Sequence, residues 1–132
     1  LIELLAVIVI LAIIAAIAVP AIGNIIAKSS DRAILADAAN VLSGAKLAIA
    51  NNECVPGTVG TDVGKTVCSN VILADYVEGD LLESGDKVTK DANDMYEIKF
   101  ENFKDITKID VGDLATDKII SETKLLELMG KK

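Results

Sequence analysis

The chain contains no histidine and no tryptophan, and only four of its 132 residues are aromatic. Its two cysteines are too few to complete a zinc site when no histidine can join them. The sequence also has no nucleophile elbow and no convincing cluster of metal ligands. It therefore predicts a protein with no catalytic residue, no metal and no cofactor.

Positive charge is scarce as well. Thirteen lysines and arginines stand against twenty aspartates and glutamates, which gives a formal net charge of −7. Neutralising phosphates requires clustered basic side chains, so no direct nucleic-acid binding is expected. The four aromatic residues, Tyr76, Tyr96, Phe100 and Phe103, all lie in the second half of the chain. The N-terminal segment therefore offers no stacked aromatic path.

What the sequence does contain is a long hydrophobic run at its N-terminus. Between Leu1 and Lys28 the only charged residue is Glu3. About 20 apolar residues in a helix span a bilayer, so residues 1–27 are long enough to cross one. A carboxylate in lipid costs roughly 2.5–3.5 kcal/mol at the helix centre and less near the interface. Because Lys28 would lie about 37 Å along the helix, we expect Glu3 to pair with a neighbouring molecule's terminal amine. The alternative is an interfacial carboxylate at the end of an ordinary membrane anchor.

From residue 28 the pattern becomes amphipathic. Apolar residues recur at steps of three and four, which predicts a helical face for the packing of a head: Ile34, Ala38, Val41, Leu42, Ala45, Ala48 and Ile49. Asn51-Asn52 and then Pro56-Gly57 end this helix, which would be close to 80 Å long. Within it, Pro20 and Gly23 are weak points, where we expect a kink or local unwinding.

Residues 54–132 read as a small acidic head with mixed structure. The best strand is 95–103, with a partner strand at 106–111 and a short third strand at 87–89. Residues 54–70 read as a loop, 71–83 as a short helix or turn, and 116–129 as a short helix or irregular tail. The predicted organisation is a hydrophobic helix (1–27), its amphipathic continuation (28–53) and a globular head (54–132). The fold class is α+β, with a short antiparallel sheet in the head.

Cys54 and Cys68 form the one possible cysteine pair in the sequence. Thirteen residues lie between them, and closing a loop of this size is worth roughly 3 kcal/mol in the chain-entropy model. An exported chain with an even number of cysteines is most simply disulfide-bonded. Two free thiols are the alternative.

Two further motifs are better explained by ordinary structure. Gly60-Thr61-Asp62-Val63-Gly64-Lys65-Thr66 ends like a phosphate-binding loop, but its first glycine is one position out of register. Asp91, Asn93, Asp94 and Glu97 are rich in oxygen ligands for calcium, yet they lack EF-hand spacing and its central glycine. We interpret the first as a loop and the second as a solvated turn.

The N-terminal sequence Leu1-Ile2-Glu3-Leu4-Leu5, followed by an Ala/Ile/Val run with Pro20, resembles the mature N-terminus of bacterial type IV pilins and pseudopilins. In that family a prepilin peptidase removes a leader, and the new N-terminus is usually an N-methylated phenylalanine. The resemblance implies that one or two residues precede Leu1. It is specific over residues 1–27, weaker to 53, and says little about the head. Ala12 stands where many of these pilins have glycine.

The resemblance implies a type IV pilin fold and a role as a major pilin. Such a subunit polymerises with copies of itself into a pilus for adhesion or twitching motility. Glu3 would pair with a neighbour's N-terminal amine during assembly. The cytoplasmic membrane would hold the subunit as a single-pass precursor, and a pilus assembly machinery with separate ATPases would drive extension. The filament would lie at the cell surface.

Two alternatives remain open at this point. One keeps the architecture and makes the chain a competence or type II secretion pseudopilin, in a short DNA-uptake or secretion filament. The other belongs to a different class: a monomeric binding module that uses the helix only as a membrane tether. The tether hypothesis leaves Glu3 unexplained.

Overall fold

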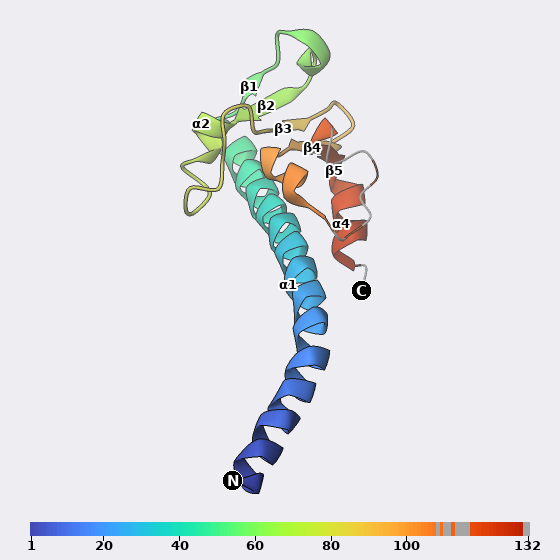
Figure 1. The fold of residues 1–132 in the computed structure, drawn as a ribbon. Helices are drawn as coiled ribbons and strands as arrows, with labels where there is room; N and C mark the ends of the chain where they lie inside the picture. The colour runs from blue at the N-terminus through green and yellow to red at the C-terminus, as the bar shows by residue number, and fades with distance from the viewer. Residues whose placement is uncertain (108, 110–111, 113–116, 131–132) are drawn as a thin grey trace.

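Figure 1 shows the computed structural model of the chain, in which one long helix carries a small head at its C-terminal end. The structure describes residues 1–107, 109, 112 and 117–130, without the side chains of residues 19–21 and 24. Helix α1 comprises Ile2–Ala50. Its many alanine and leucine residues favour a helix, and it ends before Asn52, whose φ of 59° is left-handed.

The head is built on a meander of five antiparallel strands within the described residues. In spatial order they are β1 (Val55–Pro56), β2 (Thr66–Ser69), β3 (Lys87–Lys90), β4 (Tyr96–Lys99) and β5 (Ile119–Ser121). The short helices that join or follow the strands include η1 (Gly60–Asp62), α2 (Asn70–Leu73), η2 (Glu101–Asp105) and α4 (Glu122–Gly130). The molecule is therefore α+β, as predicted, and its architecture matches the type IV pilin-like fold.

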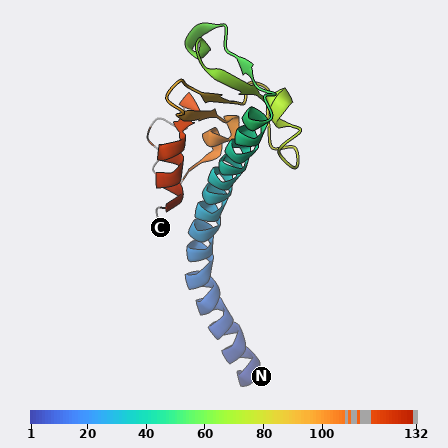
Figure 2. The ribbon, with the colours of Figure 1, turned by 180° about the vertical axis from the view of Figure 1, so that it is seen from behind.

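The core lies between one face of the sheet and the second half of α1. Strand register places Val88 opposite Ile98, and Ile98 opposite Ile120, and all three are buried. Phe100 and Phe103 add an edge-to-face pair with ring centroids 5.4 Å apart. From α1 the buried apolar residues are Leu35, Ala38, Val41, Leu42, Ala45 and Ala48. Seen from behind in Figure 2, the sheet and α4 lie along this half of α1, and the other half extends clear of them.

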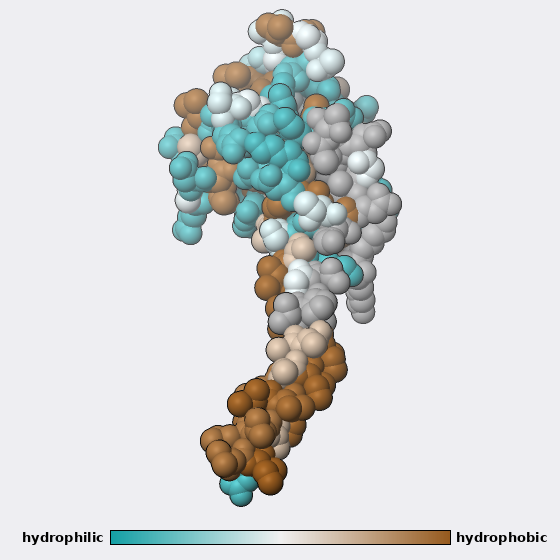
Figure 3. Space-filling model, viewed as in Figure 1, coloured by the Kyte–Doolittle hydropathy of each residue, from teal (hydrophilic) through white to brown (hydrophobic). Residues whose placement is uncertain are grey.

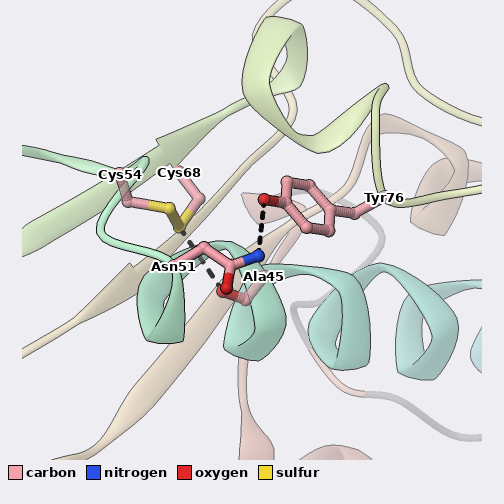
Figure 4. The surroundings of a disulfide bond; sticks show 5 residues. All are labelled: Ala45, Asn51, Cys54, Cys68 and Tyr76. Atoms are coloured by element: carbon pink, nitrogen blue, oxygen red, sulfur yellow. Dashed lines mark hydrogen bonds between the residues drawn. A yellow bond between two sulfur atoms is a disulfide. The ribbon is translucent and has the colours of Figure 1, made fainter.

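A disulfide ties the end of α1 to the sheet (Figure 4). Cys54 follows the helix and Cys68 lies in β2, with their Cα atoms 4.8 Å apart. The sulfur of Cys68 is 3.8 Å from the carbonyl oxygen of Ala45, a packing contact because a disulfide sulfur carries no hydrogen. Nearby, the Asn51 side-chain amide donates a 3.0 Å hydrogen bond to the Tyr76 hydroxyl. The predicted disulfide is confirmed, and the free-thiol alternative is wrong.

Two buried aspartates hold the head together through backbone hydrogen bonds. Asp31 of α1 is fully buried and accepts from the backbone N–H groups of Thr107, at 3.0 Å, and Ile109, at 2.9 Å. Asp86, also buried, accepts 2.8 Å bonds from the N–H groups of Glu83 and Glu101. Hydrogen bonds to a charged acceptor are stronger than those between neutral groups. Each carboxylate therefore holds in place backbone segments that lie outside the strands.

The predicted strand at 106–111 is wrong for the described residues in it, because Ile106, Thr107 and Ile109 lie in no strand. The strand that pairs with β4 on the side away from β3 is instead β5, with Ile98 opposite Ile120. The physical reason is visible in the hydrogen bonds. The backbone donors of Thr107 and Ile109 are used by the Asp31 carboxylate, so they do not enter a sheet ladder.

Other boundaries also differ from the prediction. Residues 54–70 are more than a loop, since they contain β1, η1 and β2. The strand predicted at 95–103 stops at Lys99, after which η2 turns the chain and places both Phe100 and Phe103 in the core. The C-terminal segment contains β5 before its helix. The third strand predicted at 87–89 is confirmed by β3, and the short helix or turn predicted within 71–83 is confirmed by α2 and the turn that follows it.

An ion pair fixes the entry to β5. Lys118 has a left-handed φ of 59°, and its backbone carbonyl accepts a 2.9 Å hydrogen bond from Phe100 N–H. Its ammonium donates a 2.8 Å hydrogen bond to Glu101. This hydrogen bond is the main reason that the pKa of Glu101 lies below its ordinary value and that of Lys118 lies above it.

Replacing both Cys54 and Cys68 by alanine is expected to lower the free energy of unfolding by about 3 kcal/mol, because the unfolded chain regains the freedom of the closed loop. Urea denaturation of the full chain in mild detergent, followed by tyrosine fluorescence, measures the change. Reduction of the unmodified chain serves as the control and is expected to give a similar loss. A loss below about 1 kcal/mol in both experiments would contradict the stabilising role.

Asp31→Ala is expected to destabilise the head by about 2–4 kcal/mol, because it leaves buried backbone donors without their charged acceptor. The exposed Asp75, which follows α2, provides the matched control. Asp75→Ala is expected to change stability by less than about 0.5 kcal/mol. Equal effects of the two substitutions in urea denaturation would show that Asp31 does not fix the 107–109 segment.

Lys118→Gln is expected to raise the pKa of Glu101 toward its ordinary value of 4.5. Because the folded-state pKa of Glu101 is lowered, the stability from this pair is present at neutral pH and is lost as the pH falls through the folded pKa. Carbon-detected NMR titration of the Glu101 carboxyl measures the shift. Lys104→Gln, which removes a more weakly acting charge, is expected to move this pKa less.

Candidate functional site

The first half of α1 exposes apolar side chains on every side. Among the described side chains of residues 1–26, fifteen large apolar residues are at least half exposed, and they include Ile2 at 83% and Ile17 at 72%. In Figure 3 this half of α1 is almost uniformly hydrophobic, while much of the visible head is hydrophilic. A helix that is apolar all round is one that is buried in lipid or protein.

This surface is far larger than a soluble monomer ordinarily leaves in water. The largest exposed apolar patch of a typical monomer covers a few hundred Å² and is often functional. Complete burial of one large aliphatic side chain gains roughly 1.5–3 kcal/mol, so covering fifteen is worth on the order of 20 kcal/mol or more before association costs. The first half of α1 is therefore a candidate site for insertion into a membrane or for packing against other helices.

A membrane role has support in length and composition. Within the described residues, Ile25–Ala50 is long and apolar enough to cross a membrane, and Ile2–Ala18 is a shorter apolar helix. The two stretches differ in their surroundings. Ile25–Ala50 includes Asp31 and the apolar stripe buried under the head, whereas Ile2–Ala18 is exposed at every residue up to Ile17. The N-terminal stretch is therefore the part of α1 that needs lipid or a partner.

Glu3 is the single charge on this apolar surface. It lies in the first turn of α1 and is exposed, and it makes no ion pair or hydrogen bond with any residue that the structure describes. A carboxylate in the first turn interacts favourably with the helix dipole, although that interaction is worth only about 0.3–1 kcal/mol at an exposed site. The dipole offsets little of the cost of moving Glu3 into lipid, so the site calls for a cationic partner.

Pro20 and Gly23 lie within the continuous helix assigned to Ile2–Ala50. Figure 1 shows α1 curving along its exposed half. Proline has no N–H to donate, so the carbonyl four residues before it, at Ala16, loses its usual helical partner. A sharper kink or a local unwinding at Pro20 and Gly23 stays a prediction for the assembled state.

The two motifs set aside in the sequence have structural roles in the head. The segment that imitates a phosphate-binding loop forms η1 and leads into β2, and its Lys65 pairs with Glu97 at 3.3 Å. Asp91 accepts hydrogen bonds from the backbone N–H groups of Asn93 and Met95, so it closes the turn between β3 and β4. Within the described part of the chain no group of three potential metal ligands lies close enough to hold an ion.

Sequence reasoning missed two residues that join the site to the head. Neither Asp31 nor Leu35 belongs to the packing face predicted from the sequence. Both are buried. A signal was present, because Asp31, Leu35, Ala38 and Leu42 are spaced by four, three and four residues and so share one face. A charged residue on an apolar stripe indicates a buried carboxylate with dedicated donors.

Comparison of the chain with protein-family models, with curated proteins and with solved structures gives no match. The function must therefore be inferred from the residues and their geometry.

Proposed function

We propose that this chain is the structural subunit, or major pilin, of a bacterial type IV pilus. The observation that carries the proposal is a combination of features along α1. One half is exposed and apolar with a lone carboxylate, Glu3, in its first turn, and the other half carries a folded acidic head. The N-terminal sequence resembles that of mature type IV pilins, and the fold is pilin-like. Both features fit a subunit that is stored in a membrane and then assembled.

In this mechanism the apolar half of α1 exchanges one dry environment for another. The cytoplasmic membrane first covers it, and identical helices of neighbouring subunits cover it in the filament. Small side chains such as Ala6, Ala12 and Ala15 allow helices to approach closely. Since burial is kept throughout, extraction from lipid does not expose the apolar surface to water.

Glu3 sets the register of the assembly. An unpaired carboxylate in a dry helical core is strongly unfavourable, so a subunit is held best where Glu3 meets the terminal amine of a neighbour. One subunit contributes the carboxylate and another the amine, so the contact is head to tail. Such a heterologous contact that does not close on itself produces an open helical polymer. The head then lies on the outside, where its surface meets solvent and adhesion targets.

Electron microscopy of material sheared from expressing cells tests the proposal directly. Thin, uniform filaments that contain this chain, identified by mass spectrometry, are the expected result. If the protein is instead retained in the membrane fraction and no filament forms, the major-pilin proposal is contradicted. That result would favour a pseudopilin or a tethered binding module.

Glu3→Gln tests the assembly mechanism, because it keeps the side-chain volume and removes the charge. We expect at least a tenfold loss of sheared filament while the amount of membrane-bound subunit is unchanged, since the register-setting ion pair is lost. Quantitative immunoblots of the sheared and membrane fractions measure this ratio.

Glu53→Gln is the matched control, because Glu53 is exposed just after α1 and its side chain has no partner among the described residues. It is expected to leave assembly unchanged. Wild-type assembly by the Glu3→Gln variant would exclude the ion pair as the register-setting contact.

A further inference from the structure

The face of the sheet turned away from α1 carries a polar pocket of about 230 Å³. Side chains alternate between the faces of a strand, so the residues beside buried Val88 and Ile98 point to the outer face. Lys87 and Thr89 of β3 lie opposite Lys99 and Glu97 of β4, respectively, and all four line the pocket.

A second wall comes from the segment between β1 and β2. Residues 57–65, here called the strap, are closed by a 2.8 Å hydrogen bond from Gly57 N–H to the Lys65 carbonyl. Two ion pairs hold the strap against the sheet: Asp62 with Lys87, and Lys65 with Glu97 at 3.3 Å. Thr61 of the strap also lines the pocket. The pocket is thus a half-open corner between the strap and the sheet, and two ion pairs join its walls.

Many hydrogen-bond donors in this pocket are unused. An ammonium group has three N–H donors, and Lys65 and Lys87 each commit one to a carboxylate in the described structure. Lys99 makes no hydrogen bond or ion pair with any described residue, and neither does the hydroxyl of Thr89. Three lysines and two carboxylates also give the pocket a local charge of +1, in a chain whose net charge is −7.

We propose that this pocket binds an acidic saccharide, through one sugar ring that carries a carboxylate. The carboxylate of the sugar pairs with Lys99, and its hydroxyl groups donate to Asp62 and Glu97 and accept from Thr89. Exposed Ile119 at the edge offers an apolar surface for the C–H face of the ring. A volume of about 230 Å³ corresponds to roughly eight liquid water molecules, which is suited to a single ring.

The mixture of charges selects this ligand class over simpler ones. A bare inorganic anion would use the lysines but would be repelled by Asp62 and Glu97. A neutral sugar would bond to the carboxylates and leave Lys99 unused. Because charges are screened over about 8 Å at physiological salt, the local cluster outweighs the net negative charge of the whole chain. All the residues that line the pocket belong to one chain, so ligand binding does not require filament assembly.

NMR titration of the full chain in zwitterionic detergent micelles tests the proposal, with glucuronate as the probe. We expect saturable shifts of the Thr61, Thr89 and Lys99 amide signals, with a dissociation constant on the order of 1 mM, typical of a ligand this small. Glucose has the same ring without the carboxylate, and inorganic phosphate has charge without the hydroxyl groups. Both are expected to bind at least tenfold more weakly. The absence of saturation by glucuronate, or equal binding of either comparison ligand, would overturn the proposal.

Substitutions at Lys99 provide a second test of the proposed saccharide site. Lys99→Gln is expected to weaken glucuronate binding at least tenfold, because it removes a charge-assisted hydrogen bond. Lys99→Arg keeps the charge and is expected to retain most of the affinity. Lys104→Gln removes the same charge from an exposed position outside the pocket and is expected to change nothing. Equal glucuronate affinity in Lys99→Gln and Lys104→Gln would show that the pocket does not bind the carboxylate.

Discussion

Burial of apolar surface along α1 is the interaction on which the rest of the molecule depends. The second half of α1 satisfies it within the chain, because the sheet covers the stripe from Leu35 to Ala48. The first half leaves large aliphatic side chains exposed in all directions, and the head does not reach them. Such a helix is stable only in lipid or in contact with other helices, and this requirement points to membrane insertion or assembly.

A head of this size has a modest core, and the structure shows how that core is supplemented. Small domains often need support beyond hydrophobic packing. Here α1 forms one side of the core, and the Cys54–Cys68 disulfide joins the end of that helix to β2. Asp31 accepts hydrogen bonds from the backbone N–H groups of Thr107 and Ile109. Lys46 adds an ion pair to Glu122 at 2.5 Å and lies over the Tyr96 ring, so α1, β4 and α4 also meet through one ammonium group.

The sequence was informative where one physical signal dominated. The hydrophobic run predicted the exposed half of α1, the period of three to four residues predicted most of its buried stripe, and Cys54 with Cys68 predicted their bond. The head was harder, because its strands have two to four residues, too few for alternation to stand out. The error at 106–111 arose from a long-range contact, since no local pattern announces that Asp31 accepts those backbone donors. The pocket around Lys99 could not be predicted, because strand register and the strap bring its residues together from four separate segments.

The position of the disulfide has a mechanical consequence. Along the backbone, the end of α1 is connected to β2 through β1 and the strap. Hydrogen bonds attach β1 to β2, and two ion pairs attach the strap to β3 and β4. The Cys54–Cys68 bond bypasses this route and links the end of the helix covalently to β2. Tension applied along α1 is therefore transmitted straight to a strand that is paired on both sides. The strap lies outside this covalent path, because the disulfide connects the two segments that flank it.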